Sequence, residues 1–303
     1  MTSCSLSTGT HAGCPHTQGE RFMSTFVVLG ASGTVGSELA RGLEAAGHVV
    51  RRTTSRTPAA GQVHLDLVSG RGIDEALRGA DGAFLLAPPG FTNQDVLLMP
   101  VIDAARRLGV GKLVAMSAMG ADANPEAPLR KAELALEASG VAWNVIRPNW
   151  FMQNFHTYWL QGIVTQQAIV LPVGDARTSF IDARDIADVG AALLQRSEFN
   201  NRAFDLTGGE ALTHTEVAAL LSEALERPIR FEDVTPETMR PLLLSAGLPA
   251  DYAEFLLVIL SFLKAGYAER ITDAVPSILN RAPRTFVDYA RDYREAYPQS
   301  ATR

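Results

Sequence analysis

Short apolar runs alternate with stretches of helical periodicity over the first half of the chain. The first run, Phe26-Val-Val-Leu29, leads into a glycine-rich turn. Apolar positions then recur at Val35, Leu39 and Leu43, which is the spacing of one helix face. Further apolar runs lie at 49–50, 63–67, 83–86, 112–116 and 143–146, with helical stretches such as 96–108 and 129–138 between them. Strands that alternate with helices predict a parallel sheet covered on both faces and joined by right-handed crossovers.

The alternation loosens after Pro148. The pattern predicts a helix over 151–163, an extended stretch at 168–172, a helix over 183–194 and a strand at 203–206. Thr213 and Glu216 have the spacing of a capping box, so a helix over 215–226 is expected. Residues 236–297 are helical in pattern and punctuated by prolines. The predicted fold is α/β: a Rossmann-type, doubly wound parallel sheet with a smaller, mostly helical C-terminal substrate lobe.

The charge balance excludes some classes of partner. The chain has 303 residues, with 27 Lys or Arg against 33 Asp or Glu, and a formal charge of −6 at pH 7. That charge argues against nucleic acid as the main partner. The apolar run 255–263 is too short for a membrane helix, which needs about 20 residues. We expect neither nucleic acid nor a membrane as a partner.

The first 22 residues differ in composition from the rest. Residues 1–22 are rich in Ser, Thr, Gly and His and lack the apolar stretch of a signal peptide, so they are interpreted as a disordered leader. Cys4 and Cys14 fall within it, and His11 and His16 show no metal-ligand spacing with them. We therefore predict a cytoplasmic protein with no disulfide framework and no metal site.

The glycine-rich turn is the first candidate site. Residues 30–36 read Gly-Ala-Ser-Gly-Thr-Val-Gly, directly between the first strand and the first helix. Such a turn lets the backbone approach a pyrophosphate, while the helix start offers free amides and the positive end of its dipole. The last glycine lets the helix pack close to the sheet. The predicted dinucleotide-binding residues are Gly30, Ser32, Gly33, Thr34, Val35 and Gly36; a glycine-rich turn without a ligand is the alternative.

The end of the second strand indicates which dinucleotide binds. An NAD site places an acidic residue about 20 residues beyond the glycines, whereas an NADP site offers arginine to the 2′-phosphate. No Asp or Glu occurs between Gly47 and His64, and Arg56 lies near the strand end. NADP(H) is therefore the predicted cofactor, with Arg56 at its 2′-phosphate. Arg51 and Arg52 are solvated edge charges in the alternative interpretation.

Residues after the next two strands complete the predicted cofactor site. Asp66 follows the third strand and is expected beside the adenine, and Ala87 and Pro88 follow the fourth and are expected to line the cofactor. We accordingly divide the chain into an NADP-binding Rossmann domain at 23–150 and a mixed segment at 151–303. The mixed segment is expected to return partly to the sheet and to form the substrate lobe.

Several motifs add a family resemblance. Besides the glycine turn, the chain contains Asp66-Leu67, Ser117-Ala118, Lys131-Ala-Glu133, Arg147-Pro-Asn-Trp-Phe-Met-Gln-Asn154 and Ile181-Asp-Ala-Arg-Asp-Ile186. Together they resemble the NmrA-like branch of the atypical short-chain dehydrogenase/reductases, over about Thr25 to Tyr297. The stretch 147–154 is most similar to NAD(P)H-dependent quinone or azo reductases and to iminium-reducing dehydrogenases of ergot alkaloid pathways. The resemblance implies that Pro148, Asn149 and Trp150 contact the cofactor.

The chain departs from the wider family at the proton donor. Ordinary short-chain dehydrogenases carry Tyr-x-x-x-Lys; here Lys131 matches the lysine, but the position four residues earlier is Ala127. Ser117 fits the serine after the fifth strand. The resemblance therefore implies that Lys131 and Ser117 serve catalysis and the cofactor, while His156 and Tyr158 are candidate donors from the loop after the sixth strand.

Each of these residues also has a structural interpretation. Lys131 is alternatively a helix-surface charge paired with Glu133 or Glu137. His156 is alternatively a surface or partly buried histidine, and Tyr158 a core or pocket-wall residue.

Two other stretches have both a structural and a functional interpretation. Asp182 and Asp185, with Arg184 between them, are interpreted as capping the following helix and tying the two lobes together. The run 255–263 is either the wall of a hydrophobic substrate cavity or a plain core helix.

The missing tyrosine narrows the chemistry. Carbonyl reduction is disfavoured because an alkoxide would form without a proton donor. Hydride addition to an iminium neutralises an existing charge, and a quinone delocalises the incoming one. We predict an NADPH-dependent reductase of a small apolar or aromatic acceptor (iminium, quinone or enone), with a homodimer as a possible assembly. A non-catalytic NADP(H)-binding sensor is the alternative; an isomerase or epimerase fits less well, since such relatives usually retain the tyrosine.

Overall fold

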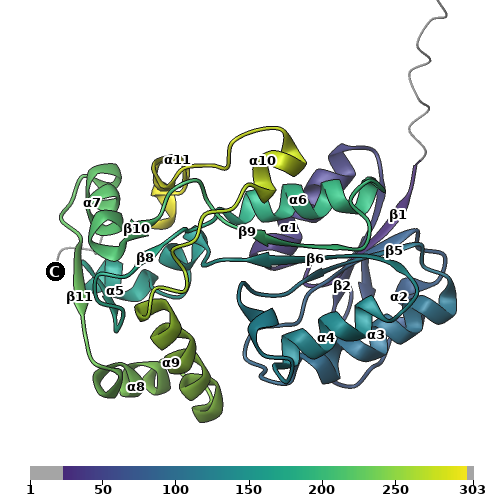
Figure 1. Cartoon of the computed structure of the whole chain (residues 1–303), viewed down its shortest axis with the longest axis horizontal. Coiled ribbons are helices and arrows are strands. Elements are labelled where there is room, and N and C mark those ends of the chain that lie inside the picture. The colour runs from purple at the N-terminus through teal and green to yellow at the C-terminus, as the bar shows by residue number, and fades with distance from the viewer. Residues whose placement is uncertain (1–22, 299–303) are drawn as a thin grey trace, which may run out of the picture.

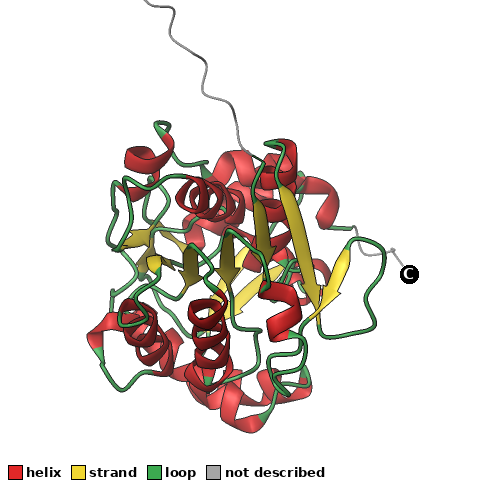
Figure 2. Ribbon diagram, turned by 90° about the vertical axis from the view of Figure 1, so that its right-hand side faces the viewer, coloured by secondary structure: helices red, strands yellow, loops and turns green. Residues whose placement is uncertain are grey.

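A seven-stranded parallel sheet forms the centre of the computed structural model, which describes residues 23–298 (Figures 1 and 2). Its strands, in chain order, are β1 (Thr25–Val28), β2 (Val49–Thr54), β3 (Gln62–His64), β4 (Gly82–Leu85), β5 (Lys112–Met116), β6 (Ala142–Pro148) and β9 (Arg202–Leu206). The order across the sheet is β3-β2-β1-β4-β5-β6-β9, so the chain moves outward from β1 in both directions. The predicted Rossmann-type sheet is confirmed. The leader predicted at 1–22 lies outside the described residues.

Helices cover both faces of this sheet. One face carries α1 (Thr34–Ala45), α6 (Ala183–Gln195) and α10 (Ala274–Leu279), and the other carries α2 (Ile73–Leu77), α3 (Gln94–Leu108) and α4 (Pro128–Glu137). Figure 1 shows α6 on one side of the sheet and α3 and α4 on the other. Within β1, Val28 packs toward α1 and its neighbour Val27 packs toward α3. Successive residues of a strand point to opposite faces, so a sheet buried on both needs continuous apolar runs.

The rest of the C-terminal half builds a second lobe with its own core. It contains a parallel pair, β7 (Ala168–Leu171) with β11 (Arg230–Asp233), and an antiparallel pair, β8 (Arg177–Thr178) with β10 (Leu212–Thr213). Its helices are α5 (Leu160–Thr165), α7 (His214–Leu225), α8 (Pro236–Ser245), α9 (Ala250–Lys264) and α11 (Phe286–Asp292), with 3-10 turns η2 (Met152–His156) and η3 (Arg294–Ala296); a further turn, η1 (Ala121–Ala123), precedes α4. The lobe core gathers around Phe155, Phe180 and Phe286.

The helix predicted over 151–163 is wrong as a continuous element. The chain forms η2, then a turn, and only then α5 at Leu160–Thr165. Tertiary contacts account for the interruption: Gln153 is buried and bonds Asp182 Oδ1 (2.9 Å) and the Ala183 amide (2.8 Å). Phe155 packs in the aromatic core, where its ring centroid lies 5.3 Å from that of Phe180. A regular helix pattern in the sequence does not reveal these distant partners.

One local expectation is met, and one open alternative is answered in part. Thr213 and Glu216 form a complete capping box at the start of α7. The apolar run 255–263 lies within α9, whose inner face buries Leu257, Leu260 and Leu263. Its outer face leaves Phe262 54% exposed, so the core interpretation accounts for one side of the helix only.

Asp182 and Asp185 are structural, as interpreted. Asp182 is fully buried and caps α6 by accepting the Arg184 amide (2.8 Å). Asp185, equally buried, accepts bonds from Arg281 (2.7 Å) and from Arg284, which follow α10. The start of α6 is therefore fastened to the segment that enters the second lobe.

Among the described residues, no helix combines the length and the apolar character that a membrane crossing requires.

Candidate functional site

The glycine turn constrains its first position by backbone conformation and its last position by close main-chain packing. Gly30 has φ +65°, and its carbonyl accepts the Gly33 amide (2.9 Å). A Cβ on Gly36 would lie 2.3 Å from the Gly30 carbonyl oxygen, and a Cβ on Gly30 would lie 2.9 Å from the Leu86 side chain. The first glycine thus makes the turn, and the last lets α1 pack directly on the backbone of β1's end.

The start of α1 is open toward the outside of this turn. Gly33 is its N-cap residue and has no side chain with which to occupy the first amides. Ser32, Gly33 and Thr34 are exposed, whereas Val35 is buried in the core. Free amides at a helix start attract an anion. The arrangement provides a cradle for a phosphate group.

The other predicted cofactor residues follow the carboxyl ends of the neighbouring strands. Arg56 follows β2, Asp66 follows β3, Ala87 and Pro88 follow β4, Ser117 follows β5, and Asn149 and Trp150 follow β6, which ends at Pro148. In a parallel sheet these ends lie at one edge, which here also holds the glycine turn after β1. The topology therefore collects the predicted residues along one edge of the sheet.

Only one of the three arginines near β2 is exposed. Arg51 donates to the carbonyls of Ala76 (2.8 Å) and Arg78 (2.7 Å), and Arg52 forms a bidentate pair with Glu44. Both guanidinium groups are therefore hydrogen-bonded to the fold, and that of Arg52 stays partly exposed to solvent. Arg56 is exposed, and its backbone is held through the Thr54 hydroxyl (3.2 Å).

Asp66 stabilises the turn that follows β3. Its carboxylate accepts the Ser69 hydroxyl (2.5 Å) and the Val68 amide (3.0 Å). These bonds, that of Ser69 first, hold its pKa below the usual range. Asp66 is therefore ionised and shapes the backbone beside the expected adenine position.

Ser117 and Lys131 differ in their surroundings. Ser117 is buried beside the Glu133 carboxylate, and its hydroxyl completes no well-formed hydrogen bond with a described residue. Lys131 is 43% exposed and pairs with Glu126 (2.9 Å), which raises the pKa of its ammonium group. The alternative pairing with Glu133 or Glu137 is wrong, because residues two and six apart on a helix do not face each other.

Asn149 and Trp150 are tied into the second lobe. The Asn149 amide donates to Ser179 Oγ (2.7 Å) and to the Ala268 carbonyl (2.8 Å). Trp150 stacks on Trp159 with ring centroids 6.1 Å apart. The side-chain donors of Asn149 are thus engaged in joining the two lobes, while its contact with a cofactor stays a prediction.

His156 belongs to an aromatic cluster of the second lobe. Its Nδ1 lies 2.8 Å from the Tyr289 hydroxyl oxygen. Its ring stacks on that of Tyr293, with the two ring centroids 4.6 Å apart. Burial lowers its pKa, which keeps the imidazole neutral at pH 7. The structural interpretation as a partly buried histidine therefore describes its position. Tyr158, by contrast, is 70% exposed.

A buried ion pair at this edge was not expected from the sequence. Arg147 of β6 donates to Glu133 of α4 through Nε (3.0 Å) and Nη2 (2.7 Å), and its Nη1 donates to Asp122 (2.8 Å). A signal was present: Arg147 interrupts an apolar strand, and Glu133 falls on the buried side of its helix. Charged residues at buried positions are expected to be paired.

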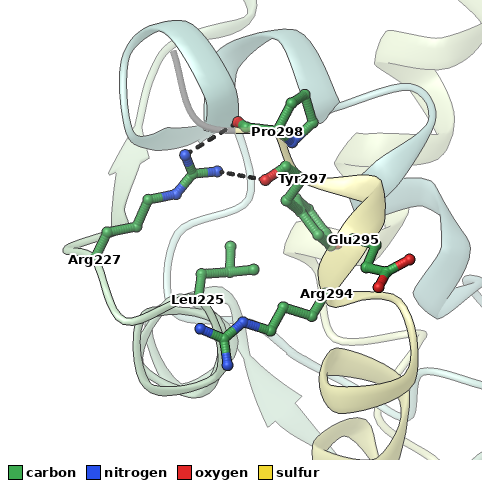
Figure 3. Close-up of a pocket in the computed structure, with 6 residues that line it drawn as sticks. All are labelled: Leu225, Arg227, Arg294, Glu295, Tyr297 and Pro298. Atoms are coloured by element: carbon green, nitrogen blue, oxygen red, sulfur yellow. Dashed lines mark hydrogen bonds between the residues drawn. The ribbon is translucent and has the colours of Figure 1, made fainter. Parts of the chain in front are cut away.

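Two surface hollows lie apart from the glycine turn. One, of about 430 Å³, is on the second lobe and is lined by Leu225, Arg227, Arg294, Glu295, Tyr297 and Pro298 (Figure 3). Its Arg227 donates to the Pro298 carbonyl (3.1 Å), so this guanidinium holds the chain near its end. The other, of about 660 Å³, adjoins edge strand β3 at Val63, His64, Arg71, Gly72 and Glu75. Neither includes a residue of the turn.

The fold and its glycine turn define a Rossmann-type protein with an open helix start for a phosphate. The family model described as the NmrA-like family matches residues 23–290, and the chain belongs to this family.

Two relatives extend over nearly the whole chain. An NAD(P)H azoreductase of Xenophilus azovorans is 30% identical over 285 residues, covering 89% of this chain and 98% of the relative. A (4-alkanoyl-5-oxo-2,5-dihydrofuran-3-yl)methyl phosphate reductase of Streptomyces griseus is 33% identical, with the same coverage.

Solved structures share the fold. Triphenylmethane reductase of Citrobacter sp., complexed with NADP(H), has a TM-score of 0.76 at 20% identity and covers 89% of this chain and 99% of its own. NmrA, a negative transcriptional regulator in complex with NADP, has a TM-score of 0.72 at 19% identity, covering 90% and 96%. The fold therefore occurs in both reductases and a regulator.

Proposed function

We propose that the protein is an NADPH-dependent reductase that transfers hydride to a small apolar or aromatic acceptor. The observation that carries this proposal is the turn at Gly30–Gly36, where backbone fills the space of the Gly36 side chain and the start of α1 opens outward. This is the geometry that lets a pyrophosphate approach the main chain. The names of the two full-length relatives support a reductase that uses NAD(P)H.

The residues present fit a nicotinamide dinucleotide. The amides of the turn and of α1 would hold the pyrophosphate, Arg56 the 2′-phosphate, and Lys131 the ribose next to the nicotinamide. The cofactor, when bound, supplies the hydride. The chain itself orients the acceptor at the carboxyl edge of the sheet and excludes water there.

The acceptor class follows from Ala127. Its methyl group occupies the N-cap of α4, where a tyrosine hydroxyl would otherwise reach a forming alkoxide. Lys131 is held charged by Glu126 and donates no proton readily at pH 7. An iminium or a quinone places the least demand on such a site, because neither builds up a localised oxyanion. We therefore rank these acceptors above simple ketones.

The reductase proposal is tested by mixing the protein with NADPH and a panel of quinones, azo compounds, cyclic iminium ions, enones and ketones. The absorbance of the reduced nicotinamide reports turnover. We expect oxidation of NADPH with quinones, azo compounds or iminium ions, and little with ketones. Absence of turnover with every acceptor, despite NADPH binding, would favour the sensor.

Replacing Arg56 by glutamate is expected to weaken NADPH binding by about 10- to 100-fold and to leave NADH binding nearly unchanged, because only NADPH carries the 2′-phosphate. Titration of each cofactor measures the effect. Arg41→Glu is the control, since Arg41 is an exposed arginine on α1 whose partner is Glu38. Equal weakening of both cofactors would contradict the role given to Arg56.

The non-catalytic sensor is the second candidate. Loss of the tyrosine at Ala127 and the likeness to a regulator's fold favour it. A sensor would bind both oxidised and reduced cofactor without consuming either. The acceptor panel separates the two candidates directly.

A further inference from the structure

The pair of Arg147 and Glu133 is the most deeply buried ion pair at the sheet edge. The side chain of Glu133 is 1% exposed and that of Arg147 is 9% exposed. Both carboxylate oxygens accept from the same guanidinium, at 3.0 and 2.7 Å. Burial raises the pKa of Glu133, but the bonds from the Arg147 and Arg130 guanidinium groups, with the nearby Ser117 hydroxyl, outweigh it and hold that pKa below its usual range. Both members of the pair are therefore charged.

Arg147 also closes a loop. Its Nη1 bonds Asp122 in η1 (2.8 Å), so one guanidinium joins Asp122 and Glu133, the two ends of segment 122–133. Backbone bonds on either side of Arg147 fasten the start of this loop to β6: the Ser117 amide donates to the Ile146 carbonyl (2.8 Å) and the Met119 amide to the Pro148 carbonyl (3.1 Å). Segment 122–133 is thus fixed at both ends.

The clamped segment carries the Lys131 ammonium and its partner Glu126. Lys131 and Glu133 lie two positions apart on α4, about 200° around the helix axis. Anchoring Glu133 inward therefore turns Lys131 outward. The N-cap of α4 is Ala127, whose methyl group provides no hydrogen bond to hold the first turn. The Ala127 and Glu126 amides donate to Asn124 (3.0 and 2.9 Å) and hold the backbone of that turn, while the ion pair ties α4 to β6.

Stability alone does not account for this pair. Removing two charges from water costs several kcal/mol, and well-packed apolar residues in place of a buried ion pair are often neutral or stabilising. An apolar pair cannot reproduce the directional hydrogen bonds of one guanidinium, which join strand β6 to two separate points of segment 122–133.

We propose that Arg147 is a positioning residue, which acts through Glu133 and Asp122 to set the direction of Lys131 and the place of Ser117. This inference rests on the proposed function, since Lys131 and Ser117 are the residues assigned to the cofactor and the acceptor. The link continues to the second lobe: Asp205 of β9 lies 3.7 Å from Arg147 and also pairs with Arg270, which follows α9. Arg147 thereby places both lobes relative to the same edge.

The test replaces the pair by apolar side chains of similar length, Glu133→Met with Arg147→Met. We expect the double variant to unfold at a temperature no lower than the wild type by more than a few degrees. We expect its NADPH dissociation constant to rise about tenfold and kcat to fall at least about tenfold, since small displacements are costly in a preorganised site. A larger primary isotope effect with deuterated NADPH would show that hydride transfer itself has slowed.

The matched control is the exposed pair of Arg107 and Asp74, which has two bonds of 2.8 Å but lies on the surface between α3 and α2. Arg107→Met with Asp74→Met is expected to leave binding and kcat unchanged. Wild-type kcat, binding and isotope effect in the Glu133/Arg147 double variant would overturn the inference.

If that variant does not fold, Arg147→Lys tests the same inference. Lysine keeps the positive charge but cannot form the bidentate hydrogen bonds to Glu133. Reduced kcat with a larger isotope effect supports the positioning role, and unchanged kinetics overturn it. Failure of the wild type to bind NADPH would instead remove the proposed function, and this inference with it.

Discussion

Replacing Gly36 by alanine is expected to lower NADPH affinity by at least about 100-fold and the free energy of unfolding by about 2–3 kcal/mol. The added Cβ would lie 2.3 Å from the Gly30 carbonyl oxygen and 2.7 Å from its carbon. Both are main-chain atoms, so the clash cannot be relieved by a change in a side-chain rotamer. The helix must move away from the turn, which displaces the amides that would bind the pyrophosphate. Calorimetric titration and urea unfolding measure the two effects.

Gly42→Ala is the matched control. Gly42 lies on the same helix, α1, and a Cβ there meets no described atom within 4 Å. Alanine is a better helix former than glycine, so this variant should be as stable as the wild type or more stable by up to about 1 kcal/mol. NADPH affinity that survives in Gly36→Ala would show that the turn does not hold the pyrophosphate.

Stability is expected to fall by up to about 3 kcal/mol between pH 6.5 and pH 4 because of His214 alone. This histidine is fully buried among Phe155, Phe180 and Phe231, and neither ring nitrogen bonds a described residue. Burial lowers its pKa from 6.5 to about 4. Between pH 6.5 and pH 4 the His214 imidazole is protonated in the unfolded chain and still neutral in the folded protein. Acid therefore favours unfolding over this range, until the folded imidazole is also protonated.

Urea unfolding of the wild type and of His214→Leu over this pH range isolates the effect. Leucine fills a similar space without a titratable group, so the variant should lose less stability on acidification. Carboxylates such as Glu133 contribute equally to both proteins, and the difference between the two curves reports His214. Parallel curves would mean that the imidazole is hydrated or paired in solution.

The sheet was predictable because its information is local. Each strand is an apolar run, and each crossover helix repeats its apolar positions at helical spacing. The glycine turn was predictable for the same reason, since Gly30, Gly33 and Gly36 occupy adjacent turns of backbone. The topology of a parallel sheet then placed the strand-end residues together without further knowledge.

Features that depend on distant partners were not predictable. The break after His156 comes from Gln153 reaching Asp182, 29 residues away, and His156 itself bonds Tyr289, 133 residues away. Strand β11 begins at Arg230 and has polar residues at three of its four positions, and only its pairing with β7 makes it a strand. Periodicity cannot indicate such pairings.

The partner of Lys131 shows the same limit. Glu133 and Glu137 are its sequence neighbours, but they are bound by Arg147 and Arg130, and Glu126 from the preceding loop takes their place. The motif Lys131-Ala-Glu133 therefore contains two charges with separate tasks. Lys131 is exposed and pairs with Glu126, and Glu133 anchors the helix to Arg147.

The most direct test of the account is calorimetric titration of the purified protein with NADPH and with NADH. We predict saturable binding of NADPH to one site per chain, at least about tenfold tighter than that of NADH. No saturable heat with either cofactor, repeated with the oxidised forms, would contradict the dinucleotide site and everything built on it.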